Sequence, residues 1–285
     1  MDLDGDGFLP RTAMTHLLVE HDGICWWCRS RPATTGEHKF KASDLVRLMG
    51  DDTLIWGDRE GNTREIRGKS GIRRDRYGVV KFPKSMCDIC NNSRSQPFDL
   101  AYEQFSNYLI EHRNLRFLPG IALVDIFGEQ WRSLGLDLAR YYAKHFGCQM
   151  VRTGVGAPDS LREFMDGALD ISDAHMALVT TDSVNSTMLK NGLSISAGAV
   201  FADRQFTQIT GCVFAAYVGS IGVRFEWQKA GLPDGERSQF FHYPVPVLNF
   251  FTDEVAVVRG VSRRPGKIAR FLQWVNTPSG NRTAE

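Results

Sequence analysis

The sequence predicts an α+β protein with two domains, and three observations support this class. A chain of 285 residues that is 42% hydrophobic can bury one large core or two modest ones. Two Cys-x-x-Cys pairs fall in the N-terminal part, and helical and strand-like patterns both follow in the C-terminal part. We expect the boundary near the "LPG" of residues 118–120, which gives domains of residues 1–118 and 119–285.

Charge and hydropathy narrow the class of protein only partly. The chain has 34 Lys+Arg against 33 Asp+Glu, so a nucleic-acid partner would have to meet a local basic patch rather than a global field. The N-terminal "MDLDGDGFLPRTAM" lacks the basic and apolar regions of a signal peptide, and no run of eighteen apolar residues occurs. These features predict a soluble, cytoplasmic protein without a membrane partner.

The N-terminal elements are expected to be short. Residues 13–21 predict a helix, and "GICWWCRSRPAT" predicts a knuckle between short strands. "TGEHKFKASDLVRLMG" predicts a strand that leads into a helix or loop. Residues 50–86 form an insert, in which "TREIRG" and "YGVVKF" alternate as the strands of small hairpins do.

Four of the six cysteines form two Cys-x-x-Cys pairs, Cys25/Cys28 and Cys87/Cys90. Each pair on a tight knuckle directs two thiolates at one tetrahedral ion, so two knuckles predict a closed structural zinc site. The 58 residues between the pairs must then enclose the insert. The alternative is a redox pair with buried thiols, which predicts a protein without zinc.

A basic segment runs through the insert to the second knuckle. Between residues 59 and 94 there are ten Lys or Arg against four Asp or Glu. A solvated loop is one interpretation of this excess, and a patch for a nucleic-acid backbone is the other. The side chains that we expect to bind nucleic acid are Lys39, Lys41, Arg67, Lys69, Arg73, Arg74 and Arg76.

After the second knuckle the pattern becomes helical. Pro97 fits the first turn of this helix, so the turn with Cys90 and Asn91 is predicted to be a separate or kinked piece. Apolar residues at helical spacing predict one buried face: Phe98, Ala101, Tyr102, Phe105, Tyr108 and Leu109.

Glu37 and His38 are adjacent, nine and ten residues after the first knuckle. Neighbouring side chains of a strand point to opposite faces, so the pair can serve one site only where the strand is bent or bulged. With Asn91 they supply a carboxylate, an imidazole and a carboxamide beside the knuckles. Carboxylate and amide oxygens suit Mg²⁺, and a histidine can deprotonate a water molecule near neutral pH. The trio predicts a hydrolytic site with a catalytic cation.

"CWWC", "EH" and "CDICNNSR" together resemble the motifs of HNH endonucleases, in the subgroup flanked by cysteine pairs. The resemblance covers residues 20 to about 112. It implies a zinc-stabilised ββα-metal nuclease domain with a long basic insert. It also implies an endonuclease that hydrolyses phosphodiester bonds in DNA, or in RNA, with Mg²⁺ or Mn²⁺.

The resemblance also implies roles for single residues. The four cysteines would hold the structural zinc, Glu37 and Asn91 would hold the catalytic Mg²⁺ or Mn²⁺, and His38 would be the general base. Arg94 would face the scissile phosphate.

Some positions depart from the family pattern. Glu37 stands where Asp is commoner, and Phe40 stands where some members have a further His. The motif that usually fixes the loop between the strands is not evident in the insert. Asn92 is an alternative to Asn91 as a ligand, and Asp99 is a further carboxylate within reach if the helix turns toward the metal.

The C-terminal domain is predicted to be α+β, and its size is consistent with target selection or with formation of a homodimer. Cys148 and Cys212 lie in apolar surroundings and are expected in the core. Two helical stretches precede three strand-like ones: "LDLARYYAKHFGCQMV", "DSLREFMDGALDIS", "LSISAGAVFADR", "TQITGCVFAAYVGSIGVRFEW" and "FFHYPVPVLNFF". Two other functions compete with the nuclease: a non-catalytic, zinc-stabilised nucleic-acid-binding module, and a redox or zinc-sensing protein.

Overall fold

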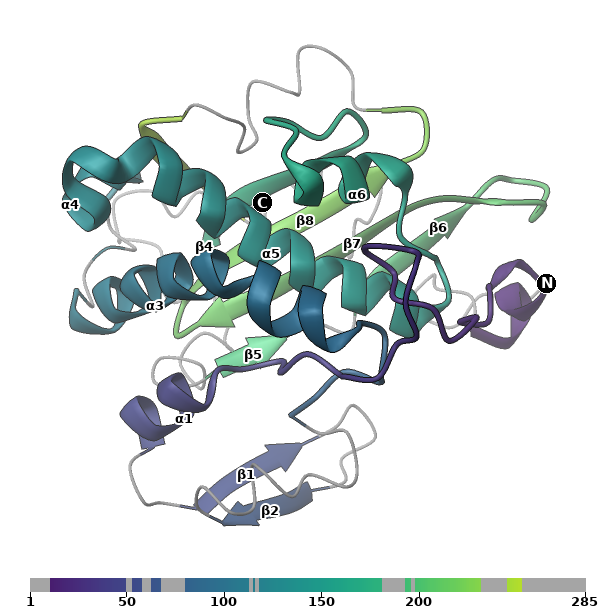
Figure 1. Cartoon of the computed structure of the whole chain (residues 1–285), viewed down its shortest axis with the longest axis horizontal. Helices are drawn as coiled ribbons and strands as arrows, with labels where there is room; N and C mark the ends of the chain where they lie inside the picture. The colour runs from purple at the N-terminus through teal and green to yellow at the C-terminus, as the bar shows by residue number, and fades with distance from the viewer. Residues whose placement is uncertain are drawn as a thin grey trace, which may run out of the picture.

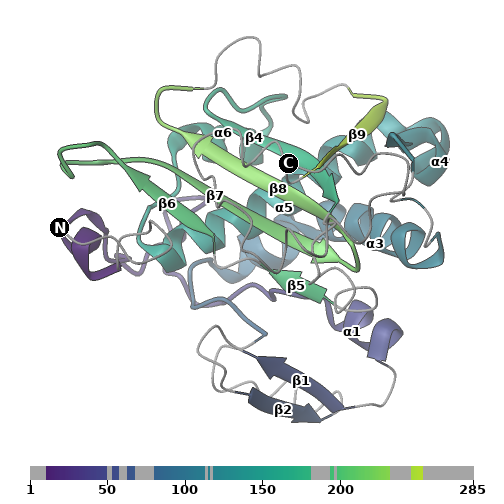
Figure 2. The ribbon, with the colours of Figure 1, turned by 180° about the vertical axis from the view of Figure 1, so that it is seen from behind.

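A β-sheet with helices on one face is the main feature of the protein, as Figure 1 and the reverse view in Figure 2 show. The computed structural model describes residues 11–49, 53–57, 63–67, 80–112, 115, 118–180, 193–195, 198–231 and 245–252. Within these residues the protein is mixed α+β, as the sequence predicts.

The large sheet has seven strands within the described residues, in the order β3-β9-β4-β8-β7-β5, with β6 also paired to β7. Neighbours are antiparallel except β4 and β9, which are parallel. The strands are β3 (Gly120–Ala122), β4 (Ala174–Thr180), β5 (Leu193–Ile195), β6 (Ala199–Ala202), β7 (Ile209–Val218), β8 (Ile221–Gln228) and β9 (Val247–Thr252).

Most of these strands lie in the stretches predicted to form strands, but the short β3 and the longer β4 do not. The sequence of β4, "AHMALVT", is apolar almost throughout, and each of its residues is buried. Because both faces of β4 are buried, the strand shows no alternation of apolar and polar residues. The sequence pattern could not distinguish it from a buried helical segment.

The helices and helical turns all lie between residues 11 and 166 of the described chain. They are η1 (Arg11–Leu17), α1 (Ala42–Met49), η2 (Ile89–Arg94), α3 (Gln96–Glu111), α4 (Leu123–Phe127), η4 (Gly128–Gln130), α5 (Trp131–Thr153) and α6 (Asp159–Asp166). The predicted amphipathic helix is confirmed as α3, which has Pro97 in its first turn and buries Phe98 and Phe105. Among the described helices, none is long and apolar enough to cross a membrane.

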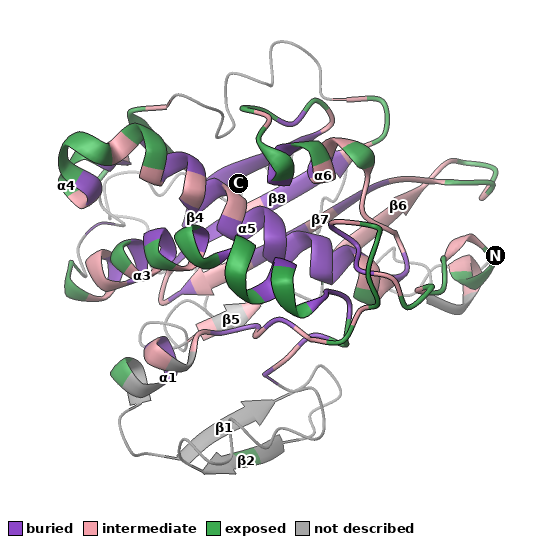
Figure 3. Ribbon diagram, in the orientation of Figure 1, coloured by how far each residue is buried: buried purple, intermediate pink, exposed green. Residues whose placement is uncertain are grey.

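Helix α5 is the central helix of the protein. It lies across one face of the sheet and beside α3, and Figure 3 shows its continuous buried surface. Phe146 stacks on Phe225 of β8 with ring centroids 4.6 Å apart, and Tyr141 stacks on Tyr102 of α3 at 3.9 Å. Cys148 and Cys212, which were expected in the core, are both fully buried.

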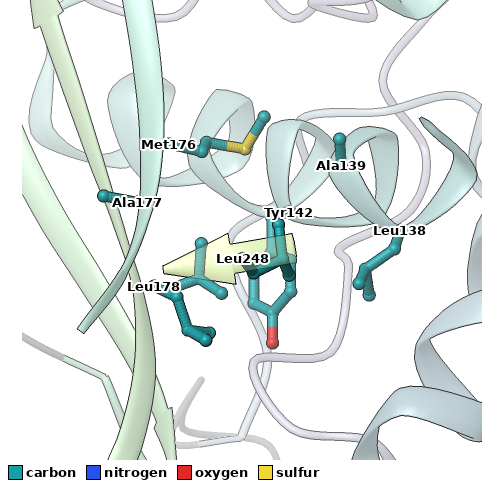
Figure 4. Close-up of a pocket in the computed structure, with 8 residues that line it drawn as sticks. Leu138, Ala139, Tyr142, Met176, Ala177, Leu178 and Leu248 are labelled. Carbon is teal, nitrogen blue, oxygen red and sulfur yellow. The ribbon is translucent and has the colours of Figure 1, made fainter. Parts of the chain in front are cut away.

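The packing between α5 and the sheet leaves one small apolar cavity, shown in Figure 4. Its volume is about 20 Å³, which is close to the space that one water molecule needs. Leu138, Tyr142, Met176 and Leu248 are among the side chains that surround it. An apolar void of this size is a packing feature and gives no indication of a ligand site.

The hydrophobic core is continuous across the predicted boundary at residues 118 and 119. One cluster of buried side chains extends from Cys25 and Trp26 to Leu248. Trp26 lies directly on α5, because a Cβ added to Gly147 would be 2.3 Å from its ring. The predicted domains of residues 1–118 and 119–285 thus share one core among the described residues.

A two-stranded hairpin, β1 (Thr53–Gly57) and β2 (Thr63–Arg67), lies outside the large sheet. Its strands pair antiparallel, with Thr53 opposite Arg67. The alternation of "TREIRG" therefore predicted a hairpin strand correctly.

Replacing Gly147 with Ala is expected to lower the free energy of unfolding by about 1–3 kcal/mol, because the new methyl group overlaps the buried Trp26 ring. The matched control is Gly135→Ala in the same helix. A Cβ at that position meets only Leu123 Cδ1, at 2.7 Å, and this flexible side chain can move. Denaturant unfolding measures both variants, and equal stability of the two would contradict the described packing of Trp26 on α5.

Candidate active site and four-cysteine cluster

Two extended segments of the N-terminal part pair with each other and lead into a helix. Residues 35–39 run antiparallel to residues 80–86, and Phe82 N donates to Glu37 O at 2.8 Å. Gly36 is needed for this close pairing, because a Cβ there would lie 2.2 Å from Phe82 O. The helical residues of η2 and α3 follow at once.

The four cysteines of the two pairs come together at the end of this ladder. Their Sγ atoms all lie within 4.8 Å of one another, and those of Cys28 and Cys87 are 3.9 Å apart. In a tetrahedral zinc site with bonds of about 2.3 Å the sulfur atoms lie about 3.8 Å apart. None of the four forms a disulfide. The cluster could therefore hold a structural metal ion such as zinc.

The thiols of the cluster influence one another. The hydrogen bond with Cys90 lowers the pKa of Cys25 to about 4, and the same contact raises the pKa of Cys90. A metal ion takes its sulfur ligands as thiolates. A cluster in which one thiol ionises this readily is suited to a cation.

Arg94 faces the cysteines. Its Nη1 donates to Cys90 Sγ at 3.8 Å, its guanidinium lies 4.2 Å from the centre of the Trp27 ring, and its Nη2 is 2.6 Å from Asp166 Oδ1. Residues four apart in a helix share a face, so Arg94 follows Cys90. The resemblance implied that Arg94 faces a scissile phosphate, but the structure places it beside the cluster and not on the cleft described next.

Cys90 and Asn91 are adjacent in the π-helical turn η2, but Cys90 belongs to the cluster and Asn91 lines the cleft described next. Asn91 N donates to Cys87 O at 3.0 Å, and Asn91 O accepts from Ser95 Oγ at 2.7 Å. A wider turn of this kind is often found at functional sites. It confirms the separate helical piece predicted before Pro97, and it lets adjacent residues serve the cysteine cluster and the cleft.

Glu37, His38 and Asn91 line one open cleft of about 900 Å³. Asn92 and Asp99 line it too, so both residues weighed as further ligands are present. The structure therefore brings together the three residues predicted to form a site, including the adjacent Glu37 and His38.

The buried carboxylate of Glu37 contacts two side chains of α5, Lys144 and His145. Lys144 Nζ lies 3.2 Å from its Oε1, and His145 Nε2 lies 3.6 Å from the same atom. Burial alone would raise the pKa of Glu37, but Lys144 and His145 together outweigh it and bring the pKa to about 2. Glu37 is thus an anion throughout the neutral range.

Lys144 is fully buried and connects two carboxylates. Besides Glu37, its Nζ contacts Asp99 Oδ1 at 3.2 Å and Ser95 Oγ at 3.2 Å. Burial alone would lower the pKa of Lys144, but the two carboxylates outweigh it and raise the pKa. Sequence analysis did not identify Lys144 or His145 as part of the site. The available signal was the pair of polar residues inside the apolar run "YYAKHFG".

His38 is half-buried beside the cleft. Burial lowers its pKa, Lys81 lowers it further, and Glu37 opposes both. The net pKa is below the usual value, so the imidazole is neutral at pH 7 and can accept a proton.

Asn91 carries a feature that suits a metal ligand. Its side-chain Oδ1 is buried and has no hydrogen-bond partner in the structure. An unpaired buried carbonyl oxygen is costly, and in a native site it calls for an explanation such as an ion. Asn92 is exposed and lacks this feature.

Lysines surround the cleft. Lys41, Lys81 and Lys84 line it, and Lys41 Nζ lies 3.7 Å from Asp99 Oδ1. Lys39, which was predicted to bind nucleic acid, is buried, with its Nζ 5.8 Å from the centre of the Phe82 ring. Arg67 ends β2, and the other predicted contacts lie outside the described residues: Lys69, Arg73, Arg74 and Arg76.

Comparison with known proteins gives no match: no family model, curated protein or solved structure is significantly similar to the chain. The function is therefore argued from the geometry of the cleft and the cysteine cluster.

Replacing Cys87 with Ser is expected to remove the bound zinc and the stable fold together, because binding of a structural metal contributes to the free energy of folding. The matched control is Cys148→Ala, since Cys148 is equally buried but lies outside the cluster. Metal analysis of the purified proteins and thermal unfolding measure both effects. A folded Cys87→Ser protein with undiminished zinc would contradict the four-cysteine site.

Proposed function

We propose that the chain is a divalent-metal-dependent endonuclease that hydrolyses phosphodiester bonds in DNA. The observation that carries the proposal is the shared cleft of Glu37, His38 and Asn91, next to a four-cysteine cluster. A cluster that only stabilises the fold would not need a buried carboxylate, a neutral imidazole and an unpaired amide oxygen at one cleft.

The order of the local elements supports the proposed likeness to HNH endonucleases. Residues 35–39 and 80–86 form an antiparallel ladder, and the helical residues after Cys87 complete a ββα arrangement. Glu37 and His38 lie on the first segment, and Asn91 lies at the start of the helical part. This is the arrangement that the resemblance implies.

The donor atoms fit a hard divalent cation. Asn91 Oδ1 is buried without a partner, and Glu37 is an ionised carboxylate. Mg²⁺ and Mn²⁺ prefer oxygen ligands, and Mg²⁺ keeps several water molecules, so one carboxylate and one amide oxygen suffice when phosphate completes the shell. In this proposal Glu37 and Asn91 hold the catalytic ion, and the four cysteines hold zinc.

In the proposed hydrolysis, His38 and the lysines of the cleft have different roles. Neutral His38 takes a proton from the attacking water molecule. Lys41, Lys81 and Lys84 bind the phosphate backbone on either side of the scissile bond. When bound, the divalent ion supplies positive charge that stabilises the scissile phosphate and the leaving 3′ oxygen.

The competing proposal is a zinc-stabilised module that binds nucleic acid without cutting it. The lysines around the cleft suit either function. The buried, unpaired Asn91 Oδ1 favours the nuclease, because a binding surface gains nothing from an unsatisfied oxygen at its base.

Replacing His38 with Ala is expected to slow DNA cleavage about 100-fold or more, because the general base is lost. Supercoiled plasmid and linear single strands are incubated with Mg²⁺, with Mn²⁺ and with a chelator. The control is His112→Ala, an exposed histidine at the end of α3 whose ring stacks on Tyr108. An unchanged cleavage rate in His38→Ala would contradict the role of His38 as general base. A wild-type protein that binds DNA without cleaving it would favour the binding module.

The adjacent asparagines provide a second test. Asn91→Ala is expected to weaken Mn²⁺ binding about 100-fold or more and to slow cleavage, because the buried oxygen ligand is removed. Asn92→Ala is expected to stay within about threefold of the wild type, since its side chain is exposed. Isothermal titration of Mn²⁺ into the oligonucleotide-bound proteins, in a His38→Ala background that leaves the oligonucleotide intact, measures both. The reverse order of effects would transfer the ligand role to Asn92.

A further inference from the structure

Lys144 is a buried lysine behind the cleft, where it contacts Glu37. Its side chain is fully buried and does not line the cleft, so it cannot touch a substrate. Its ammonium group lies 3.2 Å from Glu37 Oε1 and 3.2 Å from Asp99 Oδ1. It therefore occupies a position between two carboxylates, where a cation is expected.

The charges at the base of the cleft are already balanced without a metal ion. Two carboxylates, Glu37 and Asp99, are close to two ammonium groups, Lys144 and Lys41. A divalent ion at Glu37 would therefore experience repulsion from Lys144 at short range, and a buried pair of charges is poorly screened by salt.

A nucleic-acid phosphate would change this balance. It brings a negative charge and an oxygen ligand into the same cleft, whose remaining lysines attract it. The metal ion and the nucleic acid should therefore each bind more tightly in the presence of the other, since such a coupling is reciprocal.

We propose that Lys144 is a positioning residue that neutralises Glu37 and Asp99, so that the divalent ion binds firmly at Glu37 and Asn91 only together with a nucleic-acid phosphate. This inference rests on the proposed nuclease function and deepens it. It makes α5, from the C-terminal half of the chain, part of the catalytic unit. The positive charge of Lys144 also prevents divalent cations from binding firmly in the cleft when no substrate is present.

The test is the affinity for Mn²⁺, measured by electron paramagnetic resonance on the full-length, zinc-loaded protein. Lys144→Met is expected to bind Mn²⁺ at least tenfold more tightly than the wild type without DNA. Lys144→Arg, which keeps the charge, and Lys229→Met, which removes the charge of a lysine that does not line the cleft and donates to Gln208, should stay within threefold of the wild type. Only folded, zinc-loaded variants are compared, so the expected gain separates electrostatic from structural effects.

The coupling to nucleic acid is measured in the same way. In a His38→Ala background, which leaves DNA intact, a short duplex is expected to tighten Mn²⁺ binding at least tenfold. The duplex should produce a smaller gain when Lys144→Met is added, because the repulsion is already gone. Lys144→Gln replaces Lys144→Met if the latter fails to retain zinc.

The outcomes separate the inference from the function on which it rests. Unchanged or weaker Mn²⁺ binding in a zinc-loaded Lys144→Met protein, with a wild type that cleaves DNA, would overturn the role of Lys144 and leave the nuclease in place. Tighter Mn²⁺ binding in Lys144→Met with a wild type that never cleaves DNA would support the role of Lys144 and contradict the nuclease. Absence of Mn²⁺ binding in every protein would overturn both.

Discussion

The buried ion pairs of Lys144 are the interaction on which the site depends. The ammonium group comes from α5, and its partners come from the strand segment of Glu37 and from α3 through Asp99. Removing one partner of a buried ion pair costs about 3–5 kcal/mol, because an uncompensated charge stays behind. The three segments therefore have one favourable relative position. That position fixes the wall of the cleft and the ionised state of Glu37.

The four-cysteine cluster is the second constraint on the positions of Glu37, His38 and Asn91. One cysteine pair precedes the ladder, and the other leads into η2, so a bound metal ion would fix both ends of the motif. Trp26, between the first two cysteines, packs on Gly147 of α5, and Trp27 Nε1 donates to Asp166 Oδ1 at 2.8 Å. Trp26 thereby ties the cluster to the helix that carries Lys144, and Trp27 ties it to α6. Glu37 contacts Lys144, and Asn91 follows the cluster ligand Cys90, so both constraints act on residues that line the cleft.

The local parts of this arrangement could be predicted from the sequence. The spacing of the cysteines predicted the cluster, and the period of the apolar residues predicted α3. The positions of Glu37, His38 and Asn91 beside the knuckles predicted one site, and all three line one cleft. Each of these inferences needs only neighbouring residues or a ligand rule. The resemblance implied that Arg94 faces the scissile phosphate, whereas its guanidinium contacts Cys90 and Asp166, because the pattern does not show which face of a helical turn a side chain takes.

The parts that depend on tertiary structure could not be predicted. Lys144 is far from Glu37 in the sequence, and a lysine in an apolar helix gives no indication of which carboxylate it meets. Strand β4 has no alternation because both of its faces are buried. The sharing of one core by the two predicted domains follows from contacts such as Tyr102 on Tyr141, which no periodicity reveals.

The central claim is that one cleft binds a divalent ion through Glu37 and Asn91 while the four cysteines hold zinc. Anomalous diffraction at the manganese and zinc edges, from crystals of the zinc-loaded protein with Mn²⁺ and a bound oligonucleotide, tests it most directly. The account predicts a zinc peak among the four sulfur atoms and a manganese peak within bonding distance of Asn91 Oδ1 and the Glu37 carboxylate. A cleft that holds the oligonucleotide but shows no manganese peak beside Asn91 would contradict it.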